Sequence, residues 1–333
     1  MNLDREREEL FINLNPLQTA GRTDAPTRKA VSRYVDGYSV CDACAGVLHD
    51  VEKPPIKGLV ADLCEFLNVD RAITTAGARE AKFAVMHSIC KPGDTIVVDS
   101  NAHYTTFVAA AAAGLEAVRV PSTGEPEHAI TAEAYARTID ELKTAGNPPA
   151  LALLTHVDGD YGNLSDAAAV AEKCHEAGVP LLLNAAYTAG RMPVDAKALG
   201  ADFIACSCHK SWGACGPIGV LGVNGDFAER VFRVHEEFPK KNIEFLGCTA
   251  RGVTIVSLMA ALPRVRERVG EWEKEVEKAR WFSQHIESLG DIRQVGIKPT
   301  DHDLIRFETP MFYEMGKNHR KRGYFLHKEL TKR

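Results

Sequence analysis

Short apolar runs alternate with amphipathic stretches through the first two thirds of the chain. The runs expected to be buried strands are Thr95 to Asp99, Glu116 to Val120, Ala150 to Thr155, Leu181 to Asn184 and Asp202 to Cys206. The stretches with helical periodicity are Pro55 to Leu67, Glu80 to Ile89, Tyr104 to Ala113, Ala132 to Ala145 and Asp166 to Ala177. This alternation predicts an α/β fold with a mostly parallel sheet and with ligands at the carboxyl ends of its strands.

The pattern changes after Gly225 to charged sequence with helical periodicity. The expected elements are helical stretches over Phe227 to Glu237, Val253 to Leu262 and Arg268 to Leu289, a strand over Asp303 to Glu308, and a basic tail from Lys317 to Arg333. We therefore expect three parts. These are an N-terminal arm with a Cys-x-x-Cys loop (residues 1–45), a large domain (46–250) and a smaller C-terminal α+β domain (251–333).

Composition narrows the classes of function. A formal net charge of −5 argues against indiscriminate nucleic-acid binding, so any RNA contact must be regional. The basic run with Arg22, Arg28, Lys29 and Arg33 is either such a contact or a solvated helix face. No signal peptide or membrane-length apolar run is present, which predicts a cytoplasmic protein. Nine cysteines, an odd number, are then expected to be thiols rather than disulfides.

Three segments carry candidate chemistry. Lys210 follows the run 202–206 within Ser207-Cys208-His209-Lys210, where a lysine can attach pyridoxal phosphate (PLP) covalently; the alternative is a surface lysine at a strand end. The turn before Arg79 opens a helix, whose free N–H groups suit a phosphate. Asn184 ends a buried strand, where a polar side chain can bond the pyridine nitrogen. Two further loops, Asn101 to Tyr104 and His156 to Asn163, follow strands and are expected to line the same crevice.

These segments resemble one known family. Thr75 to Glu80, Asn184 to Pro193, Ser207 to Ser211 and the pair Cys41 and Cys44 are similar to archaeal Sep-tRNA:Cys-tRNA synthases, and the resemblance runs from about Asn13 to Phe307. It implies a fold-type I PLP-dependent transferase that converts phosphoseryl-tRNA(Cys) to cysteinyl-tRNA(Cys). It further implies a homodimer that works with a phosphoseryl-tRNA synthetase and a sulfur donor. Because the family continues through a further strand and helix, we expect the chain to be incomplete at its C-terminus.

The resemblance also assigns roles to residues. It implies that Lys210 holds PLP, that His103 stacks on the cofactor ring, and that the remaining cofactor contacts are Ala78, Arg79, Asn184, Ser207 and His209. It implies sulfur transfer by Cys41, Cys44 and Cys248, either as persulfides or as ligands of an iron–sulfur cluster. The other cysteines are expected to serve packing; they are Cys64, Cys90, Cys174, Cys206, Cys208 and Cys215.

Several alternatives stay open at this point. A Cys-x-x-Cys pair can be a redox pair, half of a zinc site or a sulfur carrier, and zinc is disfavoured because no second ligand pair follows at the usual spacing. A cysteine desulfurase of the same fold, which releases sulfur from free cysteine, is the main rival, and a catalytically silent scaffold is another. Asn184 is neutral where most fold-type I enzymes have an aspartate, so it predicts a weaker electron sink that suits loss of a good leaving group such as phosphate.

Overall fold

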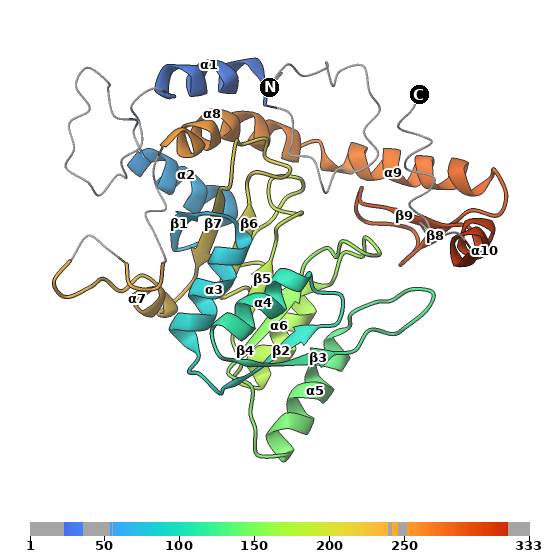
Figure 1. Cartoon of the computed structure of the whole chain (residues 1–333), viewed down its shortest axis with the longest axis horizontal. Helices are drawn as coiled ribbons and strands as arrows, with labels where there is room; N and C mark the ends of the chain where they lie inside the picture. Colours follow the sequence, from blue (N-terminus) through green and yellow to red (C-terminus); the bar gives the residue numbers. More distant parts are fainter. Residues whose placement is uncertain (1–22, 36–53, 55, 239–241, 246–251, 319–333) are drawn as a thin grey trace.

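The computed structural model describes residues 23–35, 54, 56–238, 242–245 and 252–318 (Figure 1). In that part of the chain, seven strands form one sheet in the order β1-β7-β6-β5-β4-β2-β3. The strands are β1 (Arg71–Thr75), β2 (Thr95–Asp99), β3 (Glu116–Val120), β4 (Leu151–Thr155), β5 (Leu181–Asn184), β6 (Phe203–Ser207) and β7 (Gly219–Val223). β7 runs antiparallel to its neighbours β1 and β6, and the other neighbouring pairs are parallel. The mostly parallel sheet predicted from the sequence is confirmed.

Helices cover both faces of this sheet. One face packs on α3 (Ala78–Ile89), α4 (Tyr104–Ala112) and α7 (Phe227–Val231). The other packs on α2 (Ile56–Leu67), α5 (Ala132–Thr144), α6 (Ala167–Glu176) and α8 (Gly252–Val269). Every residue of β2, β4, β6 and β7 is buried, which explains why these strands are continuous apolar runs without alternation.

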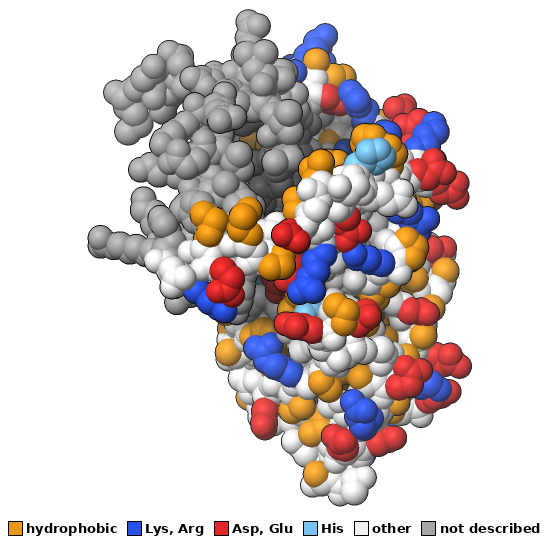
Figure 2. All heavy atoms as spheres, turned by 90° about the vertical axis from the view of Figure 1, so that its right-hand side faces the viewer, with side chains coloured by type: hydrophobic (Ala, Val, Ile, Leu, Met, Phe, Trp, Pro, Cys, Tyr) orange, Lys and Arg blue, Asp and Glu red, His pale blue; other side chains and the backbone are white. Residues whose placement is uncertain are grey.

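The C-terminal part extends away from the sheet along α8 and α9 (Trp272–Glu287), as Figure 1 shows. A two-stranded antiparallel sheet of β8 (Arg293–Val295) and β9 (Arg306–Glu308) packs under α9, and α10 (Pro310–Asn318) follows. On the side of the molecule that carries β8, β9 and α10, Lys and Arg alternate with Asp and Glu (Figure 2). Ion pairs such as Arg293 with Glu308 and Lys278 with Glu275 account for part of this mixture. The view shows no single-sign field of the kind that attracts nucleic acid over a wide area.

The basic run near the N-terminus forms α1 (Ala25–Tyr34), which packs on α8. Asp24 caps this helix, because its Oδ1 accepts a hydrogen bond of 2.7 Å from the backbone N–H of Thr27. Arg28, Lys29 and Arg33 are exposed on it. The helix predicted there is confirmed, and its cations remain available to solvent. No helix among the described residues is long and apolar enough to cross a membrane.

Three elements were not predicted and several predicted boundaries were wrong. The elements that were not predicted are β7, β8 and α10. The helix predicted over Val253 to Leu262 continues through Pro263 to Val269, because Leu258, Leu262 and Val265 are buried in the core and packing outweighs the lost backbone bond. The stretch Phe227 to Glu237 is helical only to Val231, the helix predicted from Arg268 begins at Trp272, and the strand predicted from Asp303 begins at Arg306.

Candidate active site

The ends of β1 and β6 meet beside the start of β7. Thr75 and Ser207 both pair with Gly219, so the turn after β1 and the loop after β6 lie at the same edge of the sheet. A Cβ on Gly219 would lie 2.6 Å from the Cα of Gly77. Glycine at position 219 therefore lets the turn that precedes α3 close onto the end of β6.

Lys210 lies three residues beyond β6. Its Nζ is 3.7 Å from the centroid of the Tyr187 ring, a cation–π distance, and the side chain is half-buried. Burial lowers the pKa of the Lys210 amine to about 8. At neutral pH a fraction on the order of a tenth of the side chains is then the free amine, which is the form that attacks a carbonyl.

The loop that follows Lys210 is fixed by two side chains. The indole N–H of Trp212 donates to a carbonyl of the 189–190 turn at 2.6 Å. The guanidinium of Arg268, from α8, donates to the other carbonyl of that turn and to the carbonyl of Ser211. These bonds join the loop to α8 and to the segment after β5. The backbone around Lys210 is therefore held in place by both elements.

The start of α3 lies beside the polar side chains of Ser207 and His209. The N–H of Ala78 is 3.3 Å from Ser207 Oγ. Gly77 has φ of +127°, and a Cβ there would lie 3.0 Å from the Cε1 of His209. Arg79 is exposed in the first turn. The positive end of the helix dipole, Arg79 and these short polar side chains together favour a phosphate.

Asn184 is buried at the end of β5. Its Oδ1 accepts a hydrogen bond of 3.3 Å from the backbone N–H of Ala186. With the oxygen engaged, the amide N–H₂ remains the group that can donate to a ligand.

Lys82 adds a buried cation that the sequence analysis did not identify. Its ammonium, on a residue that is 1% exposed, donates to Thr106 Oγ1 at 2.7 Å and to Thr105 Oγ1 at 3.1 Å. Burial and then the charge of Lys210 lower the pKa of Lys82 to about 7, while Asp99 opposes that shift. Burial raises the pKa of Asp99 to about 6, so most of this carboxylate is still ionised at neutral pH and it offsets part of the charge of Lys82. The site therefore holds cations and a buried anion close together.

His103 caps the N-terminus of α4 with its ring exposed. Its Nδ1 lies 2.9 Å from Thr105 Oγ1. Burial and the charges of Lys210 and Lys82 lower the pKa of His103. The lowered pKa favours the neutral ring, which packs at a tilt beside the ring of Tyr104, with 4.4 Å between the centroids, and is otherwise exposed.

The arrangement fits PLP. It offers an amine of lowered pKa, a helix start and cations for a phosphate, an amide donor, and an exposed flat ring. Lys210, the Ala78–Arg79 turn, Asn184 and His103 come from four separate segments that the sheet brings to one edge. Among the described residues, no group of three or more His, Cys, Asp or Glu side chains can hold a metal ion.

The cysteines fall into two sets. Cys41, Cys44 and Cys248, predicted to transfer sulfur, lie outside the described residues. Cys90 and Cys174 are buried, and burial raises the pKa of each to about 12, so these thiols are unreactive at neutral pH, as predicted. The remaining cysteines are two buried residues in or beside β6 and two half-buried residues: Cys206, Cys208, Cys64 and Cys215.

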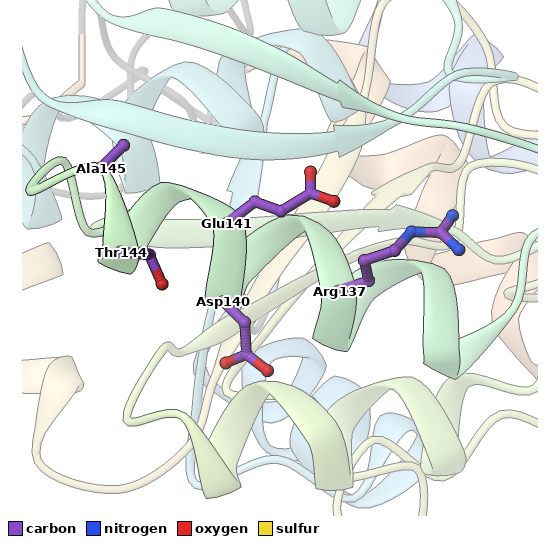
Figure 3. Close-up of a pocket in the computed structure, with 5 residues that line it drawn as sticks. All are labelled: Arg137, Asp140, Glu141, Thr144 and Ala145. Carbon is purple, nitrogen blue, oxygen red and sulfur yellow. The ribbon is translucent and has the colours of Figure 1, made fainter.

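A separate hollow lies along α5, well apart from this site in the sequence and lined by Arg137, Asp140, Glu141, Thr144 and Ala145. All five side chains come from one helix and its C-terminal end, and in the close-up they point in different directions (Figure 3). Without polar groups that converge on one point, it does not have the form of a ligand site.

Two buried histidines, one in the loop after β4 and one in the C-terminal part, lie close enough for the charge of His302 to affect the pKa of His156. His156 Nδ1 is 3.0 Å from Thr188 Oγ1, and the nitrogen Nδ1 of His302 accepts from the N–H of Leu304 at 3.0 Å. Both side chains are almost fully buried, and burial lowers the pKa of each to about 4. These histidines are neutral in the folded protein at every pH above about 5.

We predict that acid destabilises the protein through this pair. In the unfolded chain a histidine takes up its proton near pH 6.5, whereas the folded pair does so near pH 4, so the unfolded state gains protons first and stability falls between these values. Each histidine can contribute on the order of 3 kcal/mol over that range. Asp99 acts in the opposite direction, because its pKa is raised on folding.

Urea unfolding at pH 7.5 and pH 5 measures this effect. His302→Asn keeps an acceptor for the N–H of Leu304 but cannot be protonated, so its stability should depend less on pH than that of the unchanged protein. His285→Gln, at an exposed position of α9, is the matched control and should leave the pH dependence as it is. An equal dependence in His302→Asn and in the unchanged protein would exclude His302 as the cause.

Comparison with known proteins gives one consistent family. The family model described as O-phosphoseryl-tRNA(Sec) selenium transferase, SepSecS, matches residues 45–333. The chain is 51% identical to the O-phospho-L-seryl-tRNA:Cys-tRNA synthase of Methanothermobacter thermautotrophicus, over 99% of this chain and 88% of that protein. It is 52% identical to the protein of the same name from Methanosarcina acetivorans, over 98% of this chain and 86% of that one.

Solved structures agree. A SepCysS–SepCysE N-terminal domain complex contains a chain with 48% identity and a TM-score of 0.89, and the match covers 100% of this chain and 89% of that one. A cysteine desulfurase from Thermococcus onnurineus has a TM-score of 0.72 at 19% identity, over 87% of this chain and 77% of that one. At that identity the second likeness supports the fold alone.

Proposed function

This chain belongs to the family of O-phospho-L-seryl-tRNA:Cys-tRNA synthases, PLP-dependent enzymes of tRNA-dependent cysteine biosynthesis, and we propose that its reaction takes place at the strand edge that carries Lys210. The reaction replaces the phosphate of O-phosphoseryl-tRNA(Cys) by sulfur and gives cysteinyl-tRNA(Cys). The observation that carries the proposal is the position of Lys210. Its amine, with a lowered pKa, lies where the ends of β5 and β6 and the start of α3 meet.

Each site residue has a task in this proposal. Lys210 would hold PLP covalently, Asn184 would donate to the ring nitrogen and His103 would lie against the ring. The phosphate of PLP would be held by Ala78, Arg79, Ser207 and His209. When bound, PLP supplies an electron sink for the negative charge left at Cα of the substrate. Once the substrate amine had displaced Lys210 from PLP, the freed amine would accept the Cα proton, a task that suits an amine whose pKa is about 8.

Asn184 limits which reactions the site supports. A neutral amide donates a hydrogen bond to the ring nitrogen but cannot stabilise a positive charge there as a carboxylate would. The electron sink is correspondingly weaker. Loss of phosphate from Cβ is easy enough to proceed with a weak sink, so the neutral partner favours elimination of a good leaving group and its replacement.

The positive charges near Lys210 suit the substrate. Phosphoserine carries about two negative charges on its phosphate at neutral pH, and PLP carries a second phosphate. Arg79 is a cation, and Lys82, whose pKa is about 7, is charged in about half of the molecules at neutral pH. These charges therefore favour a phosphorylated substrate over free serine or cysteine.

Sulfur delivery is assigned to Cys41, Cys44 and Cys248, as persulfides or as ligands of an iron–sulfur cluster. We propose a cytoplasmic homodimer in which Cys248 of one subunit meets Cys41 and Cys44 of the other. A phosphoseryl-tRNA synthetase supplies the substrate, and a separate donor supplies the sulfur. The resemblance of these three positions to the family's cysteines supports this part of the proposal.

Product analysis tests the function. The purified protein, supplied with PLP, is incubated with phosphoseryl-tRNA(Cys) and sulfide in one reaction and with free cysteine in another. We expect cysteinyl-tRNA and inorganic phosphate from the first reaction and no alanine from the second. Alanine from free cysteine, without turnover of phosphoseryl-tRNA, would identify a cysteine desulfurase instead.

A further inference from the structure

A chain of hydrogen bonds joins the buried side of α3 to the exposed ring of His103. Lys82 Nζ lies 3.1 Å from Thr105 Oγ1, and Thr105 Oγ1 lies 2.9 Å from His103 Nδ1. The backbone N–H of Thr105 also points to His103 Nδ1, at 3.3 Å. Lys82 is fully enclosed, whereas the His103 ring is open to the site. The chain therefore links a buried ammonium to a ring that can touch a ligand.

The direction of these bonds follows from the chemistry of the donors. When Lys82 is charged, its ammonium group can only donate, so the oxygen of Thr105 accepts from Lys82 and the hydroxyl proton is free to go to His103. The backbone N–H of Thr105 can only donate in every case. That N–H therefore requires an acceptor at Nδ1, and the proton of the neutral ring must sit on Nε2.

We propose that Lys82 and Thr105 are positioning residues that hold His103 as the neutral Nε2–H tautomer with its ring in one orientation. Protonation at Nδ1 would turn the contact with the backbone N–H of Thr105 into a donor–donor clash, so these hydrogen bonds also favour the uncharged ring. A neutral ring adds no further positive charge beside Lys82 and Lys210. The contact of His103 with the cofactor rests on the proposed function. The hydrogen bonds that join Lys82, Thr105 and His103 do not depend on it.

The charged groups around this chain act in the same direction. Lys210 and Lys82 disfavour the protonated form of His103, and Asp160 favours it. Around Lys82 the cations are Lys210 and Arg79, and the anion is Asp99. The low pKa of His103 agrees with the geometry. Removal of one group should therefore change the titration of His103 in a direction that can be stated in advance.

Nitrogen-15 NMR of labelled histidines in the full chain, without added PLP, tests the proposal directly. Twelve histidines are present, and the signal lost in His103→Gln identifies the relevant one. We expect the Nε2–H tautomer in the unchanged protein. Thr105→Val keeps the backbone N–H but loses the hydroxyl donor to the neutral ring, so we expect a smaller share of the Nε2–H tautomer and a raised pKa of His103. Thr105→Ser keeps the hydroxyl and should restore both properties.

Two lysine variants separate charge from positioning. Lys82→Met should raise the pKa of His103 and also reduce the share of the Nε2–H tautomer, because it removes the group that orients the Thr105 hydroxyl toward His103. Lys210→Met removes a nearby charge but leaves the hydrogen bonds among Lys82, Thr105 and His103 intact. It should therefore raise the pKa of His103 and keep the Nε2–H tautomer. The proposal is overturned if Thr105→Val keeps the tautomer and the pKa of the unchanged protein, or if Thr105→Ser behaves like Thr105→Val. These readouts do not depend on catalysis. The positioning role of Lys82 and Thr105 can therefore be disproved while the proposed function stands, and the proposed function can be disproved while the positioning role stands.

Discussion

Lys210→Ala is expected to abolish cysteinyl-tRNA formation, with a loss of about 10³-fold or more. The variant loses the amine that both holds PLP and accepts the Cα proton, so both roles are lost together. The absorbance of bound PLP near the edge of the visible range should disappear with it. Lys173→Ala, at a half-buried lysine of α6 that pairs with Glu176, is the matched control and should keep activity and absorbance.

Borohydride reduction followed by peptide mass analysis shows which lysine carries PLP. The chain offers a real competitor, because the pKa of Lys82 is lowered even further than that of Lys210. Lys82, however, is 1% exposed and donates to two threonine hydroxyls, whereas the amine of Lys210 lies over the ring of Tyr187. We expect the label on Lys210. A label on Lys82, or an unchanged absorbance in Lys210→Ala, would show that PLP is attached elsewhere.

The difference between these lysines illustrates what the sequence could and could not indicate. Lys210 was identified because an apolar strand ends just before it and short polar residues surround it, which are local features. Lys82 lies in α3 among Ala81, Val85 and Met86, which are buried, so a lone lysine on an apolar helix face was the available signal. Its partners, Thr105 and Thr106, lie more than twenty residues away, and only the fold shows that they meet.

The same reasoning applies to the strands. The parallel strands β2, β4, β5 and β6 were predicted because strands buried on both faces are continuous apolar runs. β7 was not, because Gly219 and Gly222 lower its strand propensity. Both glycines are needed for space: a Cβ on Gly222 would lie 2.8 Å from side-chain atoms of Ile204 and Val69. Close packing across the sheet explains those glycines, and a local pattern cannot reveal it.

Cys41→Ala, Cys44→Ala and Cys248→Ala are each expected to abolish cysteinyl-tRNA formation from a physiological sulfur donor while phosphate release from phosphoseryl-tRNA stays largely intact. Elimination needs only PLP and the groups around Lys210, whereas sulfur transfer needs an accessible thiolate. In a Cys-x-x-Cys pair, a neighbouring thiol can resolve a persulfide and release sulfide. Cys174→Ala is the control, because its thiol is fully buried and burial raises its pKa to about 12.

Phosphate and cysteinyl-tRNA are measured in the same reaction, so the two steps are separated within each variant. Full activity in all three variants would show that these cysteines do not take part in sulfur transfer. Loss of phosphate release along with cysteinyl-tRNA would mean that these residues support the structure of the site rather than the delivery of sulfur. Activity that returns when sulfide is added at high concentration would place the defect in delivery.

Mixed dimers decide whether the three thiols meet across a subunit interface. If each site contains Cys41 of one subunit and Cys248 of the other, a dimer of one Cys41→Ala chain and one Cys248→Ala chain has one site that lacks both thiols and one site that keeps both. Co-expressed and separated by two different tags, such dimers should regain about half of the normal activity, although each variant alone is inactive. If both thiols come from the same subunit, each site of the mixed dimer lacks one of them and no activity returns. Sedimentation of the unchanged protein at the mass of a single chain would exclude the arrangement before any variant is made.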